Sequence, residues 1–153
     1  MELCLLLHGV TFVGFPDSSR PPSAFGREQI SNLALEHRMA SAEIKKVVSS
    51  AHVRAVQSAE ILVGAAGLKK TIKSLDDLTP QGDLCAIEEF LQSTAVETVL
   101  MVSHLPLAAK LIDYLTGESG TYIRTGSLAS ISMPFFGRRT AQLNRIQYAD
   151  GIY

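Results

Sequence analysis

Two histidines follow short apolar runs, and this placement is the strongest chemical signal in the sequence. Residues 3–7 are apolar and are followed by His8, and residues 99–102 are apolar and are followed by Ser103 and His104. Short apolar runs that end in a turn or helix signal are typical of buried strands in a parallel sheet. The carboxyl ends of such strands border the crevice in which open α/β sheets bind ligands. We therefore expect the two imidazoles to face one another there.

An arginine is expected at the same edge of the sheet. The apolar run 44–48 ends in two serines, and Arg54 follows in the first turn of the next predicted helix. A cation is unfavourable at a helix N-terminus, so an arginine there is easier to explain if it faces an anion that the helix also binds. Taken singly, Arg54 could be a solvated side chain and each histidine a strand-end residue with a local hydrogen bond. Taken together, the three predict a site for a phosphoryl group.

His8 is the candidate nucleophile of this site. A neutral imidazole is competent toward phosphorus, and a phosphohistidine intermediate divides one difficult transfer into two easier steps. A hydrogen bond at the other ring nitrogen usually fixes the required tautomer, and Gly9 would let the backbone approach both the ring and the ligand. Charge on the phosphoryl oxygens must be neutralised, for which Arg54 is the candidate. His104 would be a second donor if protonated, or a proton relay if neutral.

The remaining histidines and the two cysteines are expected to be structural or solvated. We expect His37 on a solvated helix face and His52 on the exposed rim of the turn before Arg54. Cys4 and Cys85 lie in apolar stretches and are expected to be free, buried thiols of a reducing compartment. No His, Cys, Asp or Glu pair has a strong metal-ligand spacing, so neither a metal nor a cofactor is expected.

Composition favours one compact domain over residues 1–153. Hydrophobic residues make up 46% of the chain and the formal net charge is −1, so no strong field attracts nucleic acid or an anionic membrane. No apolar run approaches the ~18 residues of a membrane span, and the N-terminus lacks the basic region of a signal peptide. We expect a cytoplasmic monomer.

Strand and helix patterns alternate along the chain and then give way to a hairpin pattern. A proline- and serine-rich segment, 14–23, is predicted to be a long loop that covers a site. The order of elements predicts a three-layer α/β sandwich, with a mostly parallel central sheet flanked by helices and a C-terminal antiparallel hairpin. The predicted strands are 44–48, 71–75, 98–103, 127–133 and 140–148 besides 3–7, and the predicted helices are 24–39, 53–66, 84–93 and 106–115.

Several motifs together resemble the histidine phosphatase superfamily, and its SixA-type phosphohistidine phosphatases in particular. Each block is weak alone, but the set is specific and spans nearly the whole chain in the right order. Leu7-His8-Gly9 resembles the family's Arg-His-Gly. The further matching blocks are Arg20-Pro21-Pro22-Ser23 with Gly26, Ser50-Ala51-His52-Val53-Arg54-Ala55-Val56-Gln57-Ser58, Leu78-Thr79-Pro80-Gln81-Gly82-Asp83, Val102-Ser103-His104-Leu105-Pro106 and Thr125-Gly126-Ser127.

The resemblance implies a role for each matched site residue. His8 would accept the phosphoryl group, Arg54 and His104 would bind it, and Gly9 and Leu105 would line the phosphate site. The implied partner is a phosphohistidine-bearing protein, for example a phosphotransfer domain. SixA-like proteins lack the carboxylate general acid of the related mutases, which fits a substrate whose imidazole leaves readily. It also fits this chain, in which no carboxylate is an obvious acid.

Leu7 is the departure from the family pattern that matters most. The family's arginine at this position grips phosphate with a bidentate guanidinium, and losing one such donor typically costs ~10²–10³ in rate. Arg20, from the predicted loop, could reach in and compensate. Two functions therefore stay open: a phosphohistidine phosphatase with a covalent intermediate on His8, and a pseudophosphatase that binds phosphate with weak or no turnover. A sugar-phosphate mutase would need a general acid and longer insertions.

Overall fold

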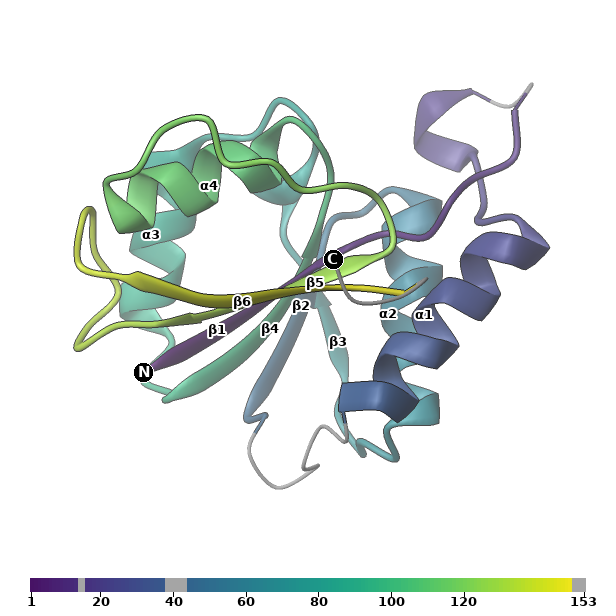
Figure 1. The fold of residues 1–153 in the computed structure, drawn as a ribbon, viewed down its shortest axis with the longest axis horizontal. Helices are drawn as coiled ribbons and strands as arrows, with labels where there is room; N and C mark the ends of the chain where they lie inside the picture. The colour runs from purple at the N-terminus through teal and green to yellow at the C-terminus, as the bar shows by residue number, and fades with distance from the viewer. Residues whose placement is uncertain (14–15, 38–43, 150–153) are drawn as a thin grey trace.

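A six-stranded mixed sheet forms the centre of the computed structural model, which describes residues 1–13, 16–37 and 44–149 (Figure 1). Its strands are β1 (Glu2–Leu7), β2 (Lys46–Ser49), β3 (Ile72–Ser74), β4 (Thr98–Ser103), β5 (Ser127–Ser132) and β6 (Gln142–Tyr148). They lie in the order β3-β2-β4-β1-β5-β6. The first four strands pair in parallel, whereas β5 is antiparallel to both β1 and β6.

Helices cover both faces of this sheet (Figure 1). One layer holds α1 (Ala24–His37) and α2 (Val53–Ala65), and the other holds α3 (Leu84–Ser93) and α4 (Leu107–Thr116). Two short 3₁₀ helices, η1 (Asp17–Ser19) and η2 (Asp76–Leu78), lie in the connections. The three layers and the C-terminal antiparallel strand pair confirm the predicted fold class.

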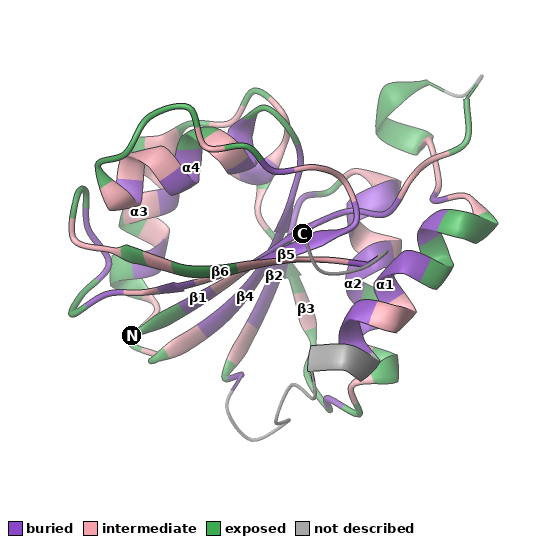
Figure 2. Ribbon diagram, viewed as in Figure 1, coloured by how far each residue is buried: buried purple, intermediate pink, exposed green. Residues whose placement is uncertain are grey.

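The central strands are buried on both faces, as Figure 2 shows in purple. On β1, Leu3, Leu5 and Leu7 belong to the core cluster beneath α3 and α4, whereas Leu6 belongs to the cluster beneath α1 and α2. Successive side chains of a strand point to opposite faces. A strand between two helical layers therefore needs apolar residues at every position, which explains the unbroken run at 3–7.

The register of the parallel strands brings their carboxyl ends together. Leu7 of β1 lies opposite Ser103 of β4, so the next residues, His8 and His104, leave the sheet side by side. The neighbouring strand β2 ends at Ser49 on the same edge, with its last residue opposite the penultimate residue of β4. The backbone pairing alone thus places three chain segments of the predicted site next to one another.

Differences from the predicted elements are confined to their ends and to loops. The predicted helix 24–39 corresponds to α1 as far as His37, and residues 38–43 lie outside the described part of the chain. Pro106 caps α4 instead of standing in its first turn. Within the predicted loop 14–23, the backbone N–H and hydroxyl of Ser19 both donate to the carbonyl of Pro16, which closes the short helix η1.

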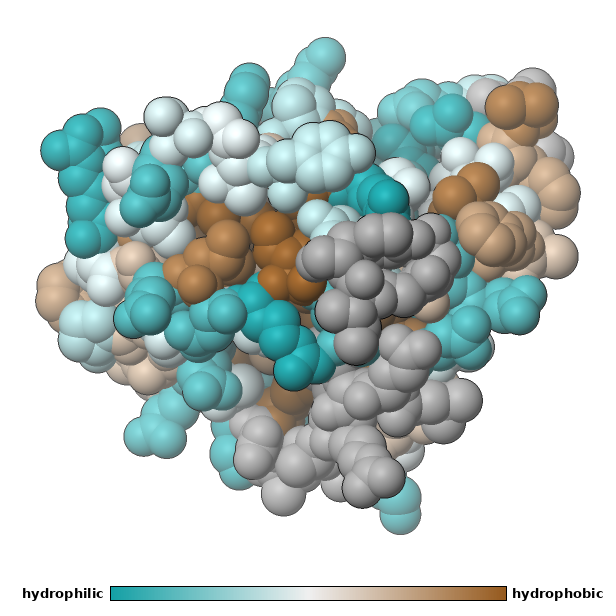
Figure 3. Space-filling view, in the orientation of Figure 1, coloured by the Kyte–Doolittle hydropathy of each residue, from teal (hydrophilic) through white to brown (hydrophobic). Residues whose placement is uncertain are grey.

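The surface of the described residues is mostly polar, with a few exposed apolar side chains. Phe12, Val13 and Phe25 are exposed on the segment before η1 and at the start of α1, and Figure 3 shows apolar side chains gathered there, at its upper right. Neither cysteine is part of a disulfide among the described residues, but Cys85 is exposed and Cys4 half-buried, so the expectation of two buried thiols is wrong. No helix in the described ranges is long and apolar enough to cross a membrane.

Candidate active site

His8 is held in the tautomer that a nucleophile requires. His8 is 7% exposed, and its Nδ1 lies 2.8 Å from the carbonyl oxygen of Gly9. A carbonyl can only accept, so Nδ1 carries the proton and Nε2 is left with its lone pair. Arg54 Nε donates to that Nε2 at 3.3 Å. Burial lowers the pKa of His8 to about 4, and the charge of Arg54 acts in the same direction, so the ring is neutral near pH 7.

The backbone after His8 is fixed by close packing against α1. A Cβ atom on Gly9 would lie 2.3 Å from the carbonyl oxygen of Gly26, so no side chain fits. The N–H of Gly9 donates to Ser58 Oγ at 3.1 Å, and that hydroxyl donates to the carbonyl of Arg54 at 2.7 Å. Gly9 is therefore required by the approach of another backbone segment, whereas the sequence suggested the approach of a ligand. The same contacts tie the backbone that follows His8 to α2.

His104 is the second buried imidazole of the site. His104 is 1% exposed, and its ring centroid lies 5.1 Å from that of His8. Nε2 lies 2.7 Å from Ser50 Oγ, and Ser50 Oγ already accepts the N–H of His52 at 3.2 Å. Ser50 Oγ can donate its hydroxyl proton to Nε2, and in that tautomer the His104 proton lies on Nδ1. That nitrogen is buried and has no hydrogen-bond partner among the described residues, as a donor to an oxyanion would be.

His104 is neutral as well. Its pKa is lowered to about 2, chiefly by burial, and the charge of Arg54 acts in the same direction. Of the two roles open to it, the cationic donor is therefore disfavoured. A neutral N–H donor or a proton relay fits its surroundings.

Arg54 is the central cation of the site and faces an anionic group. It is 3% exposed. Besides its bond to His8, it donates from Nη1 to the carbonyl of Asp17 at 2.5 Å and from Nη2 to Asp17 Oδ2 at 3.3 Å. Arg20 Nη2 donates to Asp17 Oδ1 at 3.0 Å. Arg54 was expected to face an anion, and in the structure it faces the carboxylate of Asp17, which also accepts a hydrogen bond from Arg20.

Asp17 and His52 join the site although the sequence did not place them there. His52 is half-buried, not on an exposed rim: its ring centroid lies 5.0 Å from that of His104, and its Nδ1 lies 3.7 Å from Asp17 Oδ2. Its burial follows from the short turn between β2 and α2, which folds the ring over His104, and burial lowers the pKa of His52. The side chain of His37 lies outside the described part of the chain.

The other predicted site residues occupy different positions around this core. Gly9 contributes backbone beside His8, as described above. Arg20 lies on Asp17, with its side chain about a third exposed. Leu105 is 39% exposed, whereas Leu7 is completely buried in the apolar core. The structure therefore brings His8, His104 and Arg54 together. Arg20 lies further out and is linked to Arg54 through Asp17.

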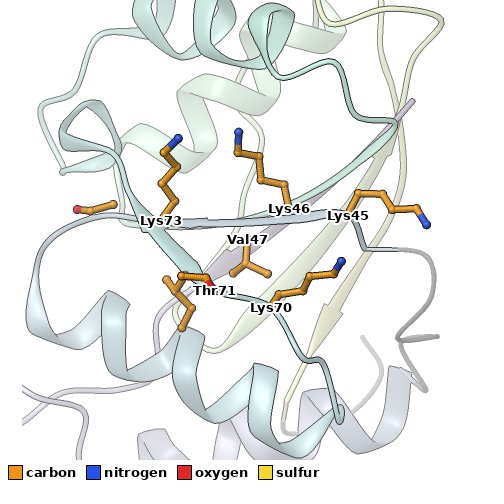
Figure 4. A pocket seen from close by; sticks show the side chains of 8 residues that line it. Lys45, Lys46, Val47, Lys70, Thr71 and Lys73 are labelled. Atoms are coloured by element: carbon orange, nitrogen blue, oxygen red, sulfur yellow. The ribbon is translucent and has the colours of Figure 1, made fainter.

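A pocket of about 520 Å³ lies along β2 and the edge strand β3, away from the histidines. Four lysines line it, and Figure 4 shows Lys46 and Lys73 on one side of the strands and Lys70 on the other. Lysines on an edge strand discourage pairing with another chain. The pocket brings no histidine or carboxylate to these lysines, so it offers no counterpart to the histidine chemistry.

The fold and the site define the class of the protein. It is an α/β domain that presents two neutral imidazoles and an arginine at the carboxyl ends of parallel strands, an arrangement suited to phosphoryl chemistry. No model of a protein family matches the chain. It is 30% identical over 145 residues to the phosphohistidine phosphatase SixA of Escherichia coli K12, which covers 92% of this chain and 90% of that protein. The chain therefore belongs to the SixA phosphohistidine phosphatase family of the histidine phosphatase superfamily.

Solved structures agree with this assignment. The structure of the protein histidine phosphatase SixA complexed with tungstate superposes with a TM-score of 0.84 and 26% identity, covering 98% of each chain. A mycobacterial glucosyl-3-phosphoglycerate phosphatase in complex with inorganic phosphate has a TM-score of 0.72 at 18% identity and covers 99% of each chain. The second likeness concerns the fold alone.

Proposed function

We propose that this protein is a phosphatase that removes the phosphoryl group from a phosphohistidine-bearing protein through a covalent phosphohistidine on His8. The observation that carries the proposal is the state of the His8 ring. Its Nδ1–H is held by the Gly9 carbonyl, and its unprotonated Nε2 lies beside the Arg54 guanidinium. Such a nitrogen can attack phosphorus without first losing a proton.

The reaction divides into two displacements at phosphorus. In the first, His8 Nε2 forms a bond to phosphorus, the P–N bond of the substrate breaks, and its electron pair goes to the leaving imidazole. In the second, the oxygen of water forms a bond to phosphorus, the bond from phosphorus to Nε2 breaks with its electron pair returning to Nε2, and the protons of the water leave with the released phosphate. Arg54 neutralises charge on the phosphoryl oxygens and His104 Nδ1–H donates to one of them. The Gly9 carbonyl holds the Nδ1 proton of His8 throughout.

A second candidate function is a phosphate-binding module with weak or no turnover. The observation that favours it is Leu7, which is fully buried in the core where the family has an arginine. The site then has one guanidinium fewer to stabilise the transition state. Intact His8, Arg54 and His104 favour the enzyme, because binding alone does not require a nucleophile in the reactive tautomer.

Turnover of a phosphohistidine-bearing phosphotransfer protein, compared with a chromogenic phosphomonoester, separates the two functions. We expect hydrolysis of the phosphohistidine, and a preference for it over the ester. His8→Ala should abolish turnover while the circular dichroism spectrum is unchanged. The matched control is Glu118→Gln, an exposed position after the far end of α4. More than a small residual activity in His8→Ala would show that the nucleophile is misassigned.

Binding of tungstate tests the site independently of turnover. A crystal soaked in tungstate should show the anion between His8, Arg54 and His104. Tungstate binding without any hydrolysis would support the binding module. Side chains of these three residues that point to different pockets would overturn both functions.

A further inference from the structure

The carboxylate of Asp17 lies at the mouth of the site, where two arginines hold it. Oδ2 accepts from Arg54 Nη2 at 3.3 Å, and Oδ1 accepts from Arg20 Nη2 at 3.0 Å. The side chain is 60% exposed, so a substrate can reach it. Its backbone carbonyl also accepts from Arg54, which ties η1 to α2. This carboxylate has no part in the two displacements described above.

One guanidinium contacts both the nucleophile and this carboxylate. Arg54 donates from Nε to His8 Nε2, and from its Nη groups to Asp17. A phosphoryl group bound to Arg54 and within reach of Nε2 would lie between them. In an in-line displacement the leaving atom stands on the side of phosphorus opposite the nucleophile. For attack by His8 on a phosphoryl group placed in this way, that side would face Asp17.

We propose that Asp17 is a specificity-determining residue that selects imidazole leaving groups over ester leaving groups. The inference rests on the proposed function and names the feature of the substrate that the site recognises. A phosphohistidine ring leaves readily when its second nitrogen is protonated, because it then departs as neutral imidazole. A carboxylate that accepts this N–H favours the protonated ring. An alkoxide or phenolate has no such N–H and develops negative charge, which the carboxylate of Asp17 repels.

In this displacement one bond to phosphorus forms and one breaks, so no other reactant is needed. As the bond from His8 Nε2 to phosphorus forms, the P–N bond of the substrate breaks and its pair stays on the leaving nitrogen. The proton on the second nitrogen of the leaving ring stays hydrogen-bonded to Asp17. The nucleophile is arranged in the same way, because its own second nitrogen donates to the Gly9 carbonyl. Each ring thus has an acceptor for the N–H that its positively charged form carries.

The hydrogen bond from Arg20 can hold the Asp17 carboxylate in position when substrate is bound. An incoming phosphoryl group takes hydrogen bonds of Arg54 that Asp17 accepts in the free protein. The bond from Arg20 at 3.0 Å keeps the carboxylate at the mouth of the site. Asp17 therefore weakens the binding of every anion through its charge, and compensates only for those that bring an N–H donor.

A pair of non-hydrolysable ligands isolates this effect from the general repulsion of anions. One is a peptide with a phosphonopyrazole side chain, whose ring carries an N–H. The other has a phosphonotriazole side chain of equal charge and similar shape, whose ring has none. The dissociation constants of both are measured by calorimetry for the wild-type protein, Asp17→Asn and the control Glu118→Gln. Asparagine retains an oxygen for the arginines, and Glu118 is an exposed carboxylate that follows α4, about 15 Å of helix from the site end.

The wild-type protein should bind the N–H ligand about tenfold more tightly than the other, as expected for one charge-assisted hydrogen bond. Asp17→Asn should reduce this ratio to about twofold or less while tightening the binding of the triazole, because the repelling charge is gone. Glu118→Gln should leave both constants unchanged. Equal binding of the two ligands by the wild type, a ratio unaffected by Asp17→Asn, or no binding of either would overturn the inference.

Turnover measured in parallel separates this inference from the proposed function. Hydrolysis of the phosphohistidine protein without discrimination between the two ligands would overturn only the role of Asp17. Discrimination between the ligands without any turnover would overturn only the phosphatase, and would leave a phosphohistidine-binding module.

Discussion

Leu7 is the residue at which the chain departs from its family's motif, and its burial determines what restoring the arginine would cost. It is the last residue of β1 and is fully buried. We expect Leu7→Arg to tighten tungstate binding and to raise turnover about tenfold or more, because a charged hydrogen bond contributes ~1.5–3 kcal/mol. The free energy of unfolding should fall by about 1.5–3 kcal/mol, the contribution of a buried leucine. Tungstate titration, kinetics and urea denaturation measure the three effects.

Arg20 provides the comparison for this substitution. If Arg20 supplies part of the missing charge, Arg20→Ala should damage the wild-type protein more than the Leu7→Arg variant. Its bond to Asp17 places its guanidinium at the mouth of the site, which is compatible with such a contribution. No gain from Leu7→Arg together with no loss from Arg20→Ala would refute compensation by arginine.

At the scale of residues, the site residues at strand ends could be predicted from the sequence. The site residues that loops and turns contribute could not. His8 and His104 follow apolar strands, and parallel pairing brings such positions together in any sheet of this topology. Asp17 stands in a proline-rich loop with no periodicity. Its contact with Arg54 spans 37 positions and depends on how η1 folds back. His52 looked solvated because the sequence gives no measure of how tightly a turn packs over its neighbour.

At the scale of elements, the contact between the end of β1 and the start of α1 positions the nucleophile. A Cβ on Gly26 would lie 2.0 Å from the carbonyl oxygen of Val10, so the two backbones touch. We expect Gly26→Ala to lower the free energy of unfolding by about 1–3 kcal/mol, as for other overpacked sites. It should also reduce turnover, because the backbone after His8 must shift. Urea denaturation and steady-state kinetics check both.

Gly64→Ala is the matched control for that substitution. Gly64 lies in α2, and a Cβ there would meet no atom within 4 Å. Alanine in a helix loses less conformational entropy than glycine, so this variant should be unchanged or more stable by about 0.5–1 kcal/mol. Equal effects of the two substitutions would mean that the contact between Gly26 and Val10 does not constrain the site.

The elements themselves were largely predictable, for a reason that also explains the exceptions. A strand between two helical layers is apolar throughout, and α3 and β4 have the residue bounds that their patterns predict. The 3₁₀ helix η1 has no buried residue, so hydrophobic periodicity cannot reveal it. Its formation depends on the carbonyl of Pro16 and the two donors of Ser19, which many loop sequences could supply.

At the scale of the whole molecule, two imidazoles are kept neutral inside a protein of nearly zero net charge. The unfolded chain binds a proton on each ring below a pKa of about 6.5, whereas burial lowers the pKa of His8 to about 4 and that of His104 to about 2 in the folded protein. Between those values the unfolded state binds more protons than the folded state. The contribution of the two neutral rings to the free energy of unfolding is therefore fully present above about pH 7. It is lost progressively as the pH drops below 6.5.

The loss of stability between about pH 7.5 and about pH 5 should consequently depend on the site histidines, because carboxylates titrate at lower pH. Each unit of pKa difference corresponds to ~1.4 kcal/mol, so His8 alone should cost about 2 kcal/mol between about pH 7.5 and about pH 5. Urea denaturation at the two pH values measures this loss. His8→Asn cannot be protonated in either state and should lose about 2 kcal/mol less than the wild type. Adding His104→Asn should flatten the dependence further. Equal losses in all three proteins would mean that the folded protein accommodates charged imidazoles, and that neutral His8 and His104 are not the resting state of the site.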